Sequence, residues 1–327
     1  MVGKKMKKFT LVSTIYNEAS RLQDSIADIE NQTLKPDEVV IVDAGSNDGT
    51  LKILDEWRKK SSSDIKIIIE EKCNVARGRN MAIENATHDL IVSTDFGCRY
   101  EKRWLESLLE KFNSDSVQVV GGNFSIREED INTLSARAAY LLAGGYENDI
   151  KGFVPSSRSI AYYKSVWENV GRYPEWLTLA GDDTYFGHQL IAKGHKIHHV
   201  KEPLVFWGRH KDFKAYDKEA FRYGLGDGES KDPLNRRNII VKTFELILRV
   251  VFIISIVINI ANGWMAWSVI LMVLSVAGFR PYIHLIKNWL KLRSKKYGIK
   301  SLMMAFLMLE TNRWNYLKGY VKGYTKK

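Results

Sequence analysis

Residues 38–50 read EVVIVDAGSNDGT, and this stretch decides the fold. The segment Glu38–Asp43 is rich in β-branched residues, which is typical of a strand buried on both faces of a parallel sheet. Small turn-forming residues follow the carboxylate of Asp43 directly. In parallel sheets ligands bind beyond the carboxyl ends of the strands. The pattern therefore predicts a buried strand that ends at a ligand-binding edge.

The same alternation extends outward in both directions. Buried strands are predicted at residues 9–16, 65–69, 90–94 and 117–120. Helical spacing of apolar residues occurs between them, at residues 19–32, 50–60, 75–86 and 101–112. Less regular sequence follows, with helices predicted at residues 129–142 and 182–193 and a strand ending at 205–207. Alternating strands and helices predict an α/β fold, with a mostly parallel sheet flanked by helices.

Composition excludes several classes of protein. The chain has 327 residues, of which 45% are hydrophobic, so it is neither disordered nor collagen-like. Two cysteines, Cys73 and Cys98, exclude a disulfide framework and indicate a reducing environment. The net charge of +11 is confined to residues 280–327, with twelve Lys and Arg and one acid. A nucleic-acid-binding domain typically spreads a basic stripe over its folded surface, so we expect no nucleic acid partner.

The composition changes near residue 236, which predicts a globular domain at 1–235 and a membrane-associated region at 236–327. Residues 246–261 are almost entirely apolar and 263–279 carry no charge, so we expect a helical hairpin at about 244–279. Basic flanks place both ends on the cytoplasmic side. The basic tail is interleaved with Trp and Tyr, which suits an anionic headgroup layer. The hairpin either spans the membrane or lies on it; the alternative is a buried hairpin in a soluble core.

Acidic side chains follow the predicted strands or begin a predicted helix. Asp43 suits a hydrogen bond to a nucleoside, or it is part of a plain turn. Asp95, in the TDFGC segment at 94–98, suits oxygen coordination of Mg²⁺ or Mn²⁺. Asp182 and Asp183 follow Gly181 in the GDDTYFGHQL segment at 181–190. They either interact with the helix N-terminus or supply a general base.

In order along the chain, these segments resemble glycosyltransferase family 2. The resemblance covers roughly residues 8–230, and its segments are TIYNE at 14–18, VDAGSNDGT at 42–50, RGRN at 77–80, TDFGC at 94–98 and GDDTYFGHQL at 181–190. No single segment is specific, but their order is. The resemblance implies a GT-A fold and an inverting enzyme that uses a nucleotide-diphosphate sugar and a divalent metal, Mg²⁺ or Mn²⁺.

The resemblance also implies roles for individual residues. Thr14 and Tyr16 match residues that line the base pocket, and Asp43 matches the acid that contacts the nucleoside. Arg79 matches an arginine that lies near the base and the diphosphate. Asp95 matches the first acid of the metal-binding DxD motif.

Further positions match the acceptor side of the family site. Asp183 matches the catalytic base, and Asp182 would orient the acceptor or support the metal shell. The DxD motif is reduced to Asp95-Phe96-Gly97, so a metal needs further oxygen ligands. His210 is a candidate metal ligand, or an exposed loop histidine. The QxxRW segment of processive synthases is absent, which favours transfer of a single sugar.

The resulting hypothesis is an inverting glycosyltransferase at the cell membrane, with its catalytic domain on the cytoplasmic side. Its acceptor is expected to be a lipid-linked glycan. A polyprenyl-phosphate sugar synthase is one alternative. A catalytically silent nucleotide-sugar-binding scaffold at the membrane is another, although the retained acidic pair at 182 and 183 argues against it.

Overall fold

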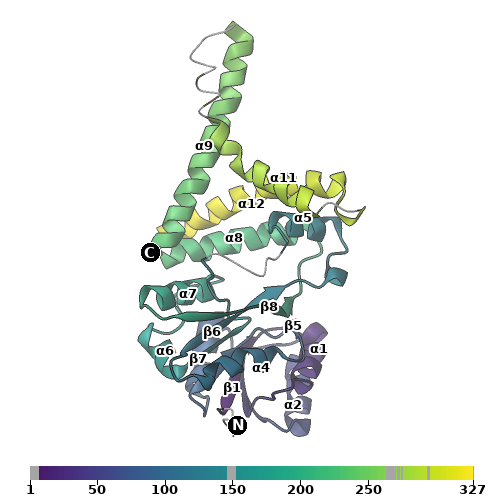
Figure 1. Cartoon of the computed structure of the whole chain (residues 1–327), viewed down its shortest axis with the longest axis vertical. Helices are drawn as coiled ribbons and strands as arrows, with labels where there is room; N and C mark the ends of the chain where they lie inside the picture. The colour runs from purple at the N-terminus through teal and green to yellow at the C-terminus, as the bar shows by residue number, and fades with distance from the viewer. Residues whose placement is uncertain are drawn as a thin grey trace. The chain divides into compact units, whose positions relative to one another are not determined.

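The computed structural model describes residues 7–145, 152–262, 270, 273, 275–292 and 295–326. The chain divides into two compact units, which Figure 1 shows with their elements labelled. The sheet unit comprises Met1–Asp130 and Tyr146–Arg209, and the helical unit comprises Ile131–Gly145 and His210–Lys327.

Within the described residues, the sheet unit forms an eight-stranded sheet in the order β3-β2-β1-β4-β7-β6-β8-β5. The strands are β1 (Phe9–Ile15), β2 (Glu38–Asp43), β3 (Asp64–Ile69), β4 (Leu90–Ser93), β5 (Cys98–Tyr100), β6 (Val119–Ser125), β7 (Ile160–Tyr163) and β8 (Ile197–Trp207). Strands β3, β2, β1 and β4 are parallel, as predicted. Because β7 is antiparallel to β4 and β6, and β5 is antiparallel to β8, the whole sheet is mixed. Strands β6 and β8 pair in parallel, so most of the strands still run in one direction.

Helices cover both faces of this sheet. They are α1 (Ala19–Glu30), α2 (Thr50–Lys60), α3 (Val75–Glu84), α4 (Trp104–Leu109), α6 (Lys164–Asn169) and α7 (Asp182–Ala192), with short 3₁₀ turns η1 (Glu110–Asn113) and η2 (Glu128–Asp130). Leu11 of β1 belongs to the core formed with α1, α2 and α4. The next residue, Val12, belongs to the core formed with α3, α6 and α7. This alternation explains the continuous apolar strands in the sequence.

The predicted elements agree best in the first 100 residues. Later, the predicted helix at 129–142 begins only at Leu134, and β5, β7 and α6 are elements that the sequence analysis did not anticipate. Strands β5 and β7 have only three and four residues, too few to show a periodicity of their own.

The helical unit contains α5 (Leu134–Leu142), α8 (Phe213–Ser230), α9 (Pro233–Asn262), η3 (Val276–Phe279), α11 (Arg280–Leu292), η4 (Lys295–Tyr297) and α12 (Ile299–Thr325). Helices α8 and α12 approach through paired glycines. A Cβ on Gly224 of α8 would clash with the carbonyl oxygen of Tyr316, and one on Gly319 of α12 would clash with that of Phe221. The composition boundary near residue 236 therefore lies inside this unit, because α8 packs against α12.

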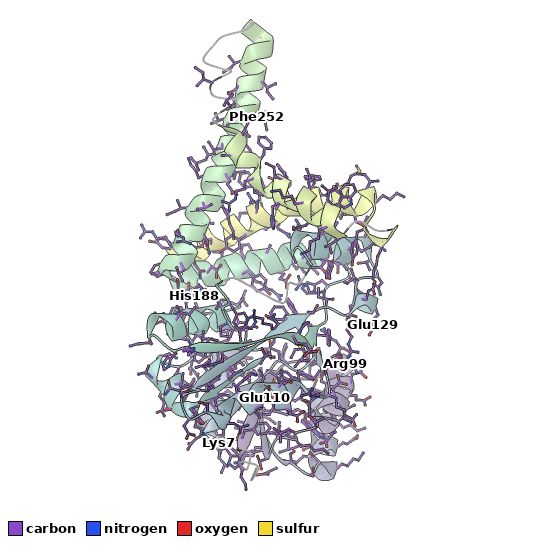
Figure 2. All side chains as sticks on the ribbon, in the orientation of Figure 1. Lys7, Arg99, Glu110, Glu129, His188 and Phe252 are labelled. Atoms are coloured by element: carbon purple, nitrogen blue, oxygen red, sulfur yellow. The ribbon has the colours of Figure 1, made fainter. Side chains whose placement is uncertain are left out.

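The apolar residues 246–261 lie within α9, as the hairpin hypothesis expects of its first helix. Arg249, which interrupts them, is buried; it donates a hydrogen bond to Gly278 O at 2.9 Å and lies 3.5 Å from Glu310. Phe252, labelled in Figure 2, meets the ring of Phe279 edge-on at 4.8 Å.

The second half of the hairpin, residues 263–279, lies mostly outside the described residues. None of the helices in the described ranges has the length and apolar character needed to cross a membrane. The expectation of spanning helices is therefore not supported there.

A buried carboxylate, that of Glu38, joins three neighbouring strands and one loop of the sheet unit. Glu38 of β2 accepts hydrogen bonds from Thr10 Oγ1 at 2.5 Å and from the amide and hydroxyl of Thr87, both at 2.7 Å. Lys66 of β3 lies 2.5 Å away. Burial alone would raise the pKa of Glu38, but Lys66 and the threonine donors outweigh it and lower the pKa from 4.5 to about 2.

We expect Glu38→Gln to destabilise the fold by about 3 kcal/mol at neutral pH, since a pKa lowered this far corresponds to that free energy. The folded-state pKa lies below the unfolded one, so this stabilisation is present above pH 4.5 and is lost as the pH falls through about 2. Urea unfolding at several pH values measures it. Glu110→Gln, at an exposed pair with Lys111, is the control and should change stability little.

Candidate active site

A buried arginine lies at the centre of the site. Asn74 caps α3 by accepting a hydrogen bond from Arg77 N at 2.8 Å. Gly78 lets the helix approach β1, because a Cβ at this position would clash with the side chain of Thr14. The next residue, Arg79, consequently points inward, and its side chain is only 4% exposed.

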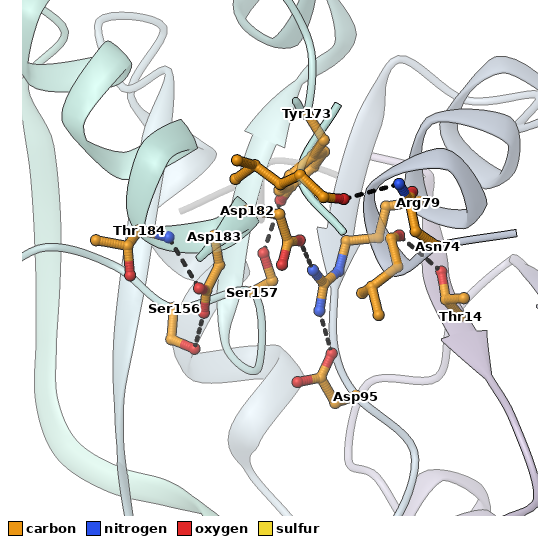
Figure 3. A network of polar contacts seen from close by, with 12 residues as sticks. Thr14, Asn74, Arg79, Asp95, Ser156, Ser157, Tyr173, Asp182, Asp183 and Thr184 are labelled. Atoms are coloured by element: carbon orange, nitrogen blue, oxygen red, sulfur yellow. Dashed lines mark hydrogen bonds and ion pairs between the residues drawn. The ribbon is translucent and has the colours of Figure 1, made fainter. Parts of the chain in front are cut away.

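Arg79 bridges two carboxylates from distant parts of the chain, as Figure 3 shows. Its Nη2 donates a hydrogen bond at 2.5 Å to Oδ1 of Asp95, which lies just beyond the end of β4. Its Nη1 pairs with Asp182 at the start of α7. Burial opposes charge on Asp95, but Arg79 and then Arg158 hold its pKa below the usual value. Burial raises the pKa of Asp182; Arg79 opposes this, and the neighbouring Asp183 and Asp95 add to it. The pKa values of Asp95 and Asp182 are therefore shifted in opposite directions, although both carboxylates pair with the guanidinium of Arg79.

Asp183 joins the same network through a serine and a second arginine. Its Oδ2 accepts a hydrogen bond from Ser156 Oγ at 2.9 Å, and its Oδ1 accepts one from Thr184 N at 2.8 Å. Arg158 donates to Ser156 Oγ at 3.0 Å, and its Nε lies 3.7 Å from Asp95 Oδ2. The structure therefore connects Asp95 and Asp183 through Arg158 and Ser156.

The residues predicted to contact the nucleoside lie at the ends of β1 and β2. Asp43 is fully buried, and its Oδ1 accepts hydrogen bonds from the amides of Gly45 at 2.9 Å and Ser46 at 2.7 Å. These two hydrogen bonds form the plain turn that was one of the two interpretations of Asp43. The buried Oδ2, however, has no hydrogen-bond partner among the described residues, which leaves an acceptor for a ligand. Thr14 is half-buried beside Gly78, and Tyr16 is 59% exposed.

The reduced DxD motif has a carboxylate from another element beside it. Gly97, where the second acid of the motif would stand, has a φ of +93°, and a Cβ there would clash with Glu18 Oε1. Burial raises the pKa of Glu18, Arg21 opposes this, and Asp48 and Asp95 add to it. The carboxylate of Glu18 thus occupies the space of the missing acid.

This donor set fits a hard divalent cation only in part. Carboxylate oxygens suit Mg²⁺ and Mn²⁺. Across the described part of the chain, however, no group of three or more His, Cys, Asp or Glu side chains is placed to hold a metal ion. Asp95 and Glu18 therefore fit a cation that takes its other ligands from diphosphate and water.

His210, the other predicted metal ligand, belongs to the helical unit. Its Nε2 lies 3.7 Å from Glu219 Oε1, and its ring meets Tyr216 edge-on at 5.4 Å. A metal role for His210 remains a prediction.

Sequence reasoning missed Ser156, Arg158 and Glu18. Arg158 lies over the ring of Trp207 at 3.9 Å, which fixes its guanidinium near Asp95. The segment Ser156–Arg158 has no periodicity that would single it out. Only the missing second acid of the DxD motif, at Gly97, could have pointed to Glu18, because a missing acid implies that another residue replaces it.

The fold and the site together define a glycosyltransferase with the GT-A fold, and comparisons with known proteins agree. The family described as "Glycosyl transferase family 2" matches residues 10–168. The O-antigen chain rhamnosyltransferase WbaN of Salmonella anatum is 29% identical over 231 residues, which are 67% of this chain and 70% of WbaN. EpsE of Bacillus subtilis, described as "Putative glycosyltransferase", is 33% identical over 228 residues, which are 67% of this chain and 78% of EpsE.

A solved structure shows the same fold. Mannosyltransferase PcManGT from Pyrobaculum calidifontis, in complex with GDP-Man and Mn²⁺, aligns over 99% of this chain and 89% of its own, with a TM-score of 0.59 and 16% identity. The chain belongs to glycosyltransferase family 2.

We expect Arg79→Gln to destabilise the protein by about 3–5 kcal/mol, because it leaves the buried Asp182 and the partly buried Asp95 without this counter-charge. Thermal or urea unfolding measures the loss. The neighbouring Arg77→Gln is the control, since Arg77 is 43% exposed and its ion pairs are longer, at 3.5 and 3.8 Å. Equal stability of the two variants would mean that Arg79 does not hold the site together.

Proposed function

We propose that this enzyme transfers one sugar, with inversion, from a nucleotide-diphosphate sugar to a lipid-linked glycan at the cytoplasmic face of the cell membrane. The observation that carries the transfer chemistry is the network joining Asp95 and Asp183 at the carboxyl edge of the sheet. The name of WbaN, an O-antigen chain rhamnosyltransferase, supports glycan assembly as the setting.

The donor would bind along the ends of β1 and β2. The unpaired Oδ2 of Asp43 accepts a hydrogen bond from the base or ribose, and the exposed ring of Tyr16 covers the nucleoside. Thr14 lines the same pocket. Arg79 and Arg158 place two positive charges beside Asp95, where the diphosphate of the donor would lie.

Asp183 is the proposed general base. Its carboxylate takes the proton of the acceptor hydroxyl while that oxygen forms a bond to the anomeric carbon and the bond to the diphosphate breaks. One such displacement inverts the configuration. Ser156 and the amide of Thr184 orient the carboxylate. Asp182, held by Arg79, keeps the start of α7 in position.

A divalent cation is proposed at Asp95 and Glu18, and His210 stays a candidate ligand from the sequence alone. When bound, such a cation neutralises the developing charge on the leaving diphosphate. The contribution of the protein would be the carboxylate of Asp95, that of Glu18 beside Gly97, and the guanidinium groups of Arg79 and Arg158.

Membrane attachment is proposed for the helical unit. Apolar side chains at helical spacing on α9 are exposed, including Ile240, Phe244, Ile247 and Ile254, at 51–59%. The basic residues of 280–327 would face anionic headgroups. An enzyme held this way acts most directly on a lipid-borne acceptor.

We expect Asp183→Asn to lower kcat by about 10²–10⁴-fold with donor affinity nearly unchanged, because only proton abstraction is lost. Sugar transfer and nucleotide-sugar binding are measured on the same preparation. Ser156→Ala is the companion variant and should lower kcat less, since the base itself remains. Normal turnover of Asp183→Asn would remove Asp183 from this role.

Because two carboxylates are too few to hold a metal alone, we expect Mn²⁺ to bind tightly only with the nucleotide present. Asp95→Ala and Glu18→Gln should each weaken that metal-dependent nucleotide binding by about tenfold or more, the loss typical of one charged contact. Calorimetry with and without Mn²⁺ provides the measurement, and Asp55→Asn, at a surface pair with Arg58, is the control. If Glu18→Gln binds like the wild type while Asp95→Ala does not, Glu18 is not a ligand.

A further inference from the structure

A cavity lies wholly within the helical unit. Its volume is about 680 Å³, and its walls come from α5, α9, α12 and α11, including Arg280 and Pro281 at the start of α11. None of the residues assigned above to the donor, the base or the metal lines it.

The cavity is strongly basic. Six of its lining side chains are cationic or can become so: Arg237, Lys242, Arg280, His284, Lys287 and Arg313. The acid that lines it, Glu245, is paired with Arg313 at 2.9 Å. Arg237, Arg280 and Lys287 are exposed and form no ion pair with another described residue. The cavity therefore keeps a net positive charge that its own acid does not neutralise.

Arg313 and Lys242 are less exposed than the other cations that line the cavity. Nη1 of Arg313 is buried and has no hydrogen-bond partner among the described residues. Lys242 lies over the ring of Tyr316 at 3.8 Å, and burial lowers its pKa, with Arg313 adding to this effect and Asp227 and Glu245 opposing it. A buried donor without an acceptor is costly, so an anion that reaches Arg313 would remove an existing penalty.

Apolar side chains share the same walls. They are Leu142, Val241, Ile283, Leu285 and Leu309. Val241 and Ile283 are 46% and 48% exposed, and the exposed apolar face of α9 begins at the adjacent Ile240. A free inorganic anion would gain nothing from these surfaces, whereas a ligand with a charged head and a hydrocarbon chain would use both.

We propose that this cavity binds the phosphate or diphosphate of a membrane lipid, with the first part of the hydrocarbon chain along its apolar wall. The inference rests on the proposed function, because it makes the seated lipid the carrier of the acceptor. The arginines and lysines hold the phosphate oxygens by charge-assisted hydrogen bonds, and the chain continues toward the apolar face of α9.

The test uses two matched triple variants of the full chain. One removes cavity charges: Arg237→Gln, Arg280→Gln and Lys287→Gln. The control removes three exposed charges of the same unit that do not line the cavity: Arg236→Gln, Lys300→Gln and Lys318→Gln. Both lose the same net charge, so general attraction to an anionic surface falls equally.

Binding is measured to phosphatidylcholine vesicles that carry either a polyprenyl phosphate or the uncharged polyprenol of the same length. We expect the wild type to prefer the phosphate vesicles and the cavity variant to lose about tenfold or more of that affinity beyond the control, as expected for lost charge-assisted contacts. Equal losses in the two variants would overturn the proposal, leaving general electrostatic attraction. Competition by inorganic phosphate as effective as that by the lipid phosphate would also overturn it.

Hydrolysis of the nucleotide sugar, measured without any lipid, separates this proposal from the proposed function. If both triple variants hydrolyse the donor like the wild type while the cavity variant alone loses lipid phosphate binding, the site is supported. If the wild type hydrolyses no donor yet binds the lipid phosphate through these side chains, the transferase hypothesis fails and the lipid site stands.

Discussion

The site depends on a single buried guanidinium, that of Arg79. Taking three charged groups out of water is costly unless each is neutralised, and Arg79 achieves this by pairing Asp95 beyond β4 with Asp182 at the start of α7. The pairing also ties together segments more than 80 residues apart in the sequence. The end of β4 and the start of α7, which carries Asp183, are therefore held in a fixed arrangement.

Around this centre, the site replaces what its motif lacks. A family DxD motif supplies two acids in one turn, whereas here the second position is Gly97 and the carboxylate of Glu18 fills the space beside it. Arg158, held over Trp207, adds a positive charge near Asp95. In the proposed function, Arg79 and Arg158 would therefore balance part of the charge of the diphosphate, and a cation would be shared between the protein and the donor.

The helical unit shows a different use of charge. Helices α8 and α12 approach each other closely through glycines. Apolar side chains on α9 are exposed, and basic side chains line the cavity, so both are available for other partners. A positively charged cavity beside an exposed apolar helix face combines the two attractions by which a lipid phosphate is held. The proposed acceptor and the proposed mode of attachment thus follow from the same surface.

The sequence by itself determined the parallel half of the sheet, the helices between its strands and the acids at its edge. These features follow from local periodicity, because a buried strand or an amphipathic helix must repeat its apolar residues. Only the tertiary structure decided that β7 turns the sheet mixed, that Arg79 joins Asp95 to Asp182, and that Ser156, Arg158 and Glu18 belong to the site. Contacts between side chains distant in the chain have no period, so they become visible only when the strands and helices are packed together.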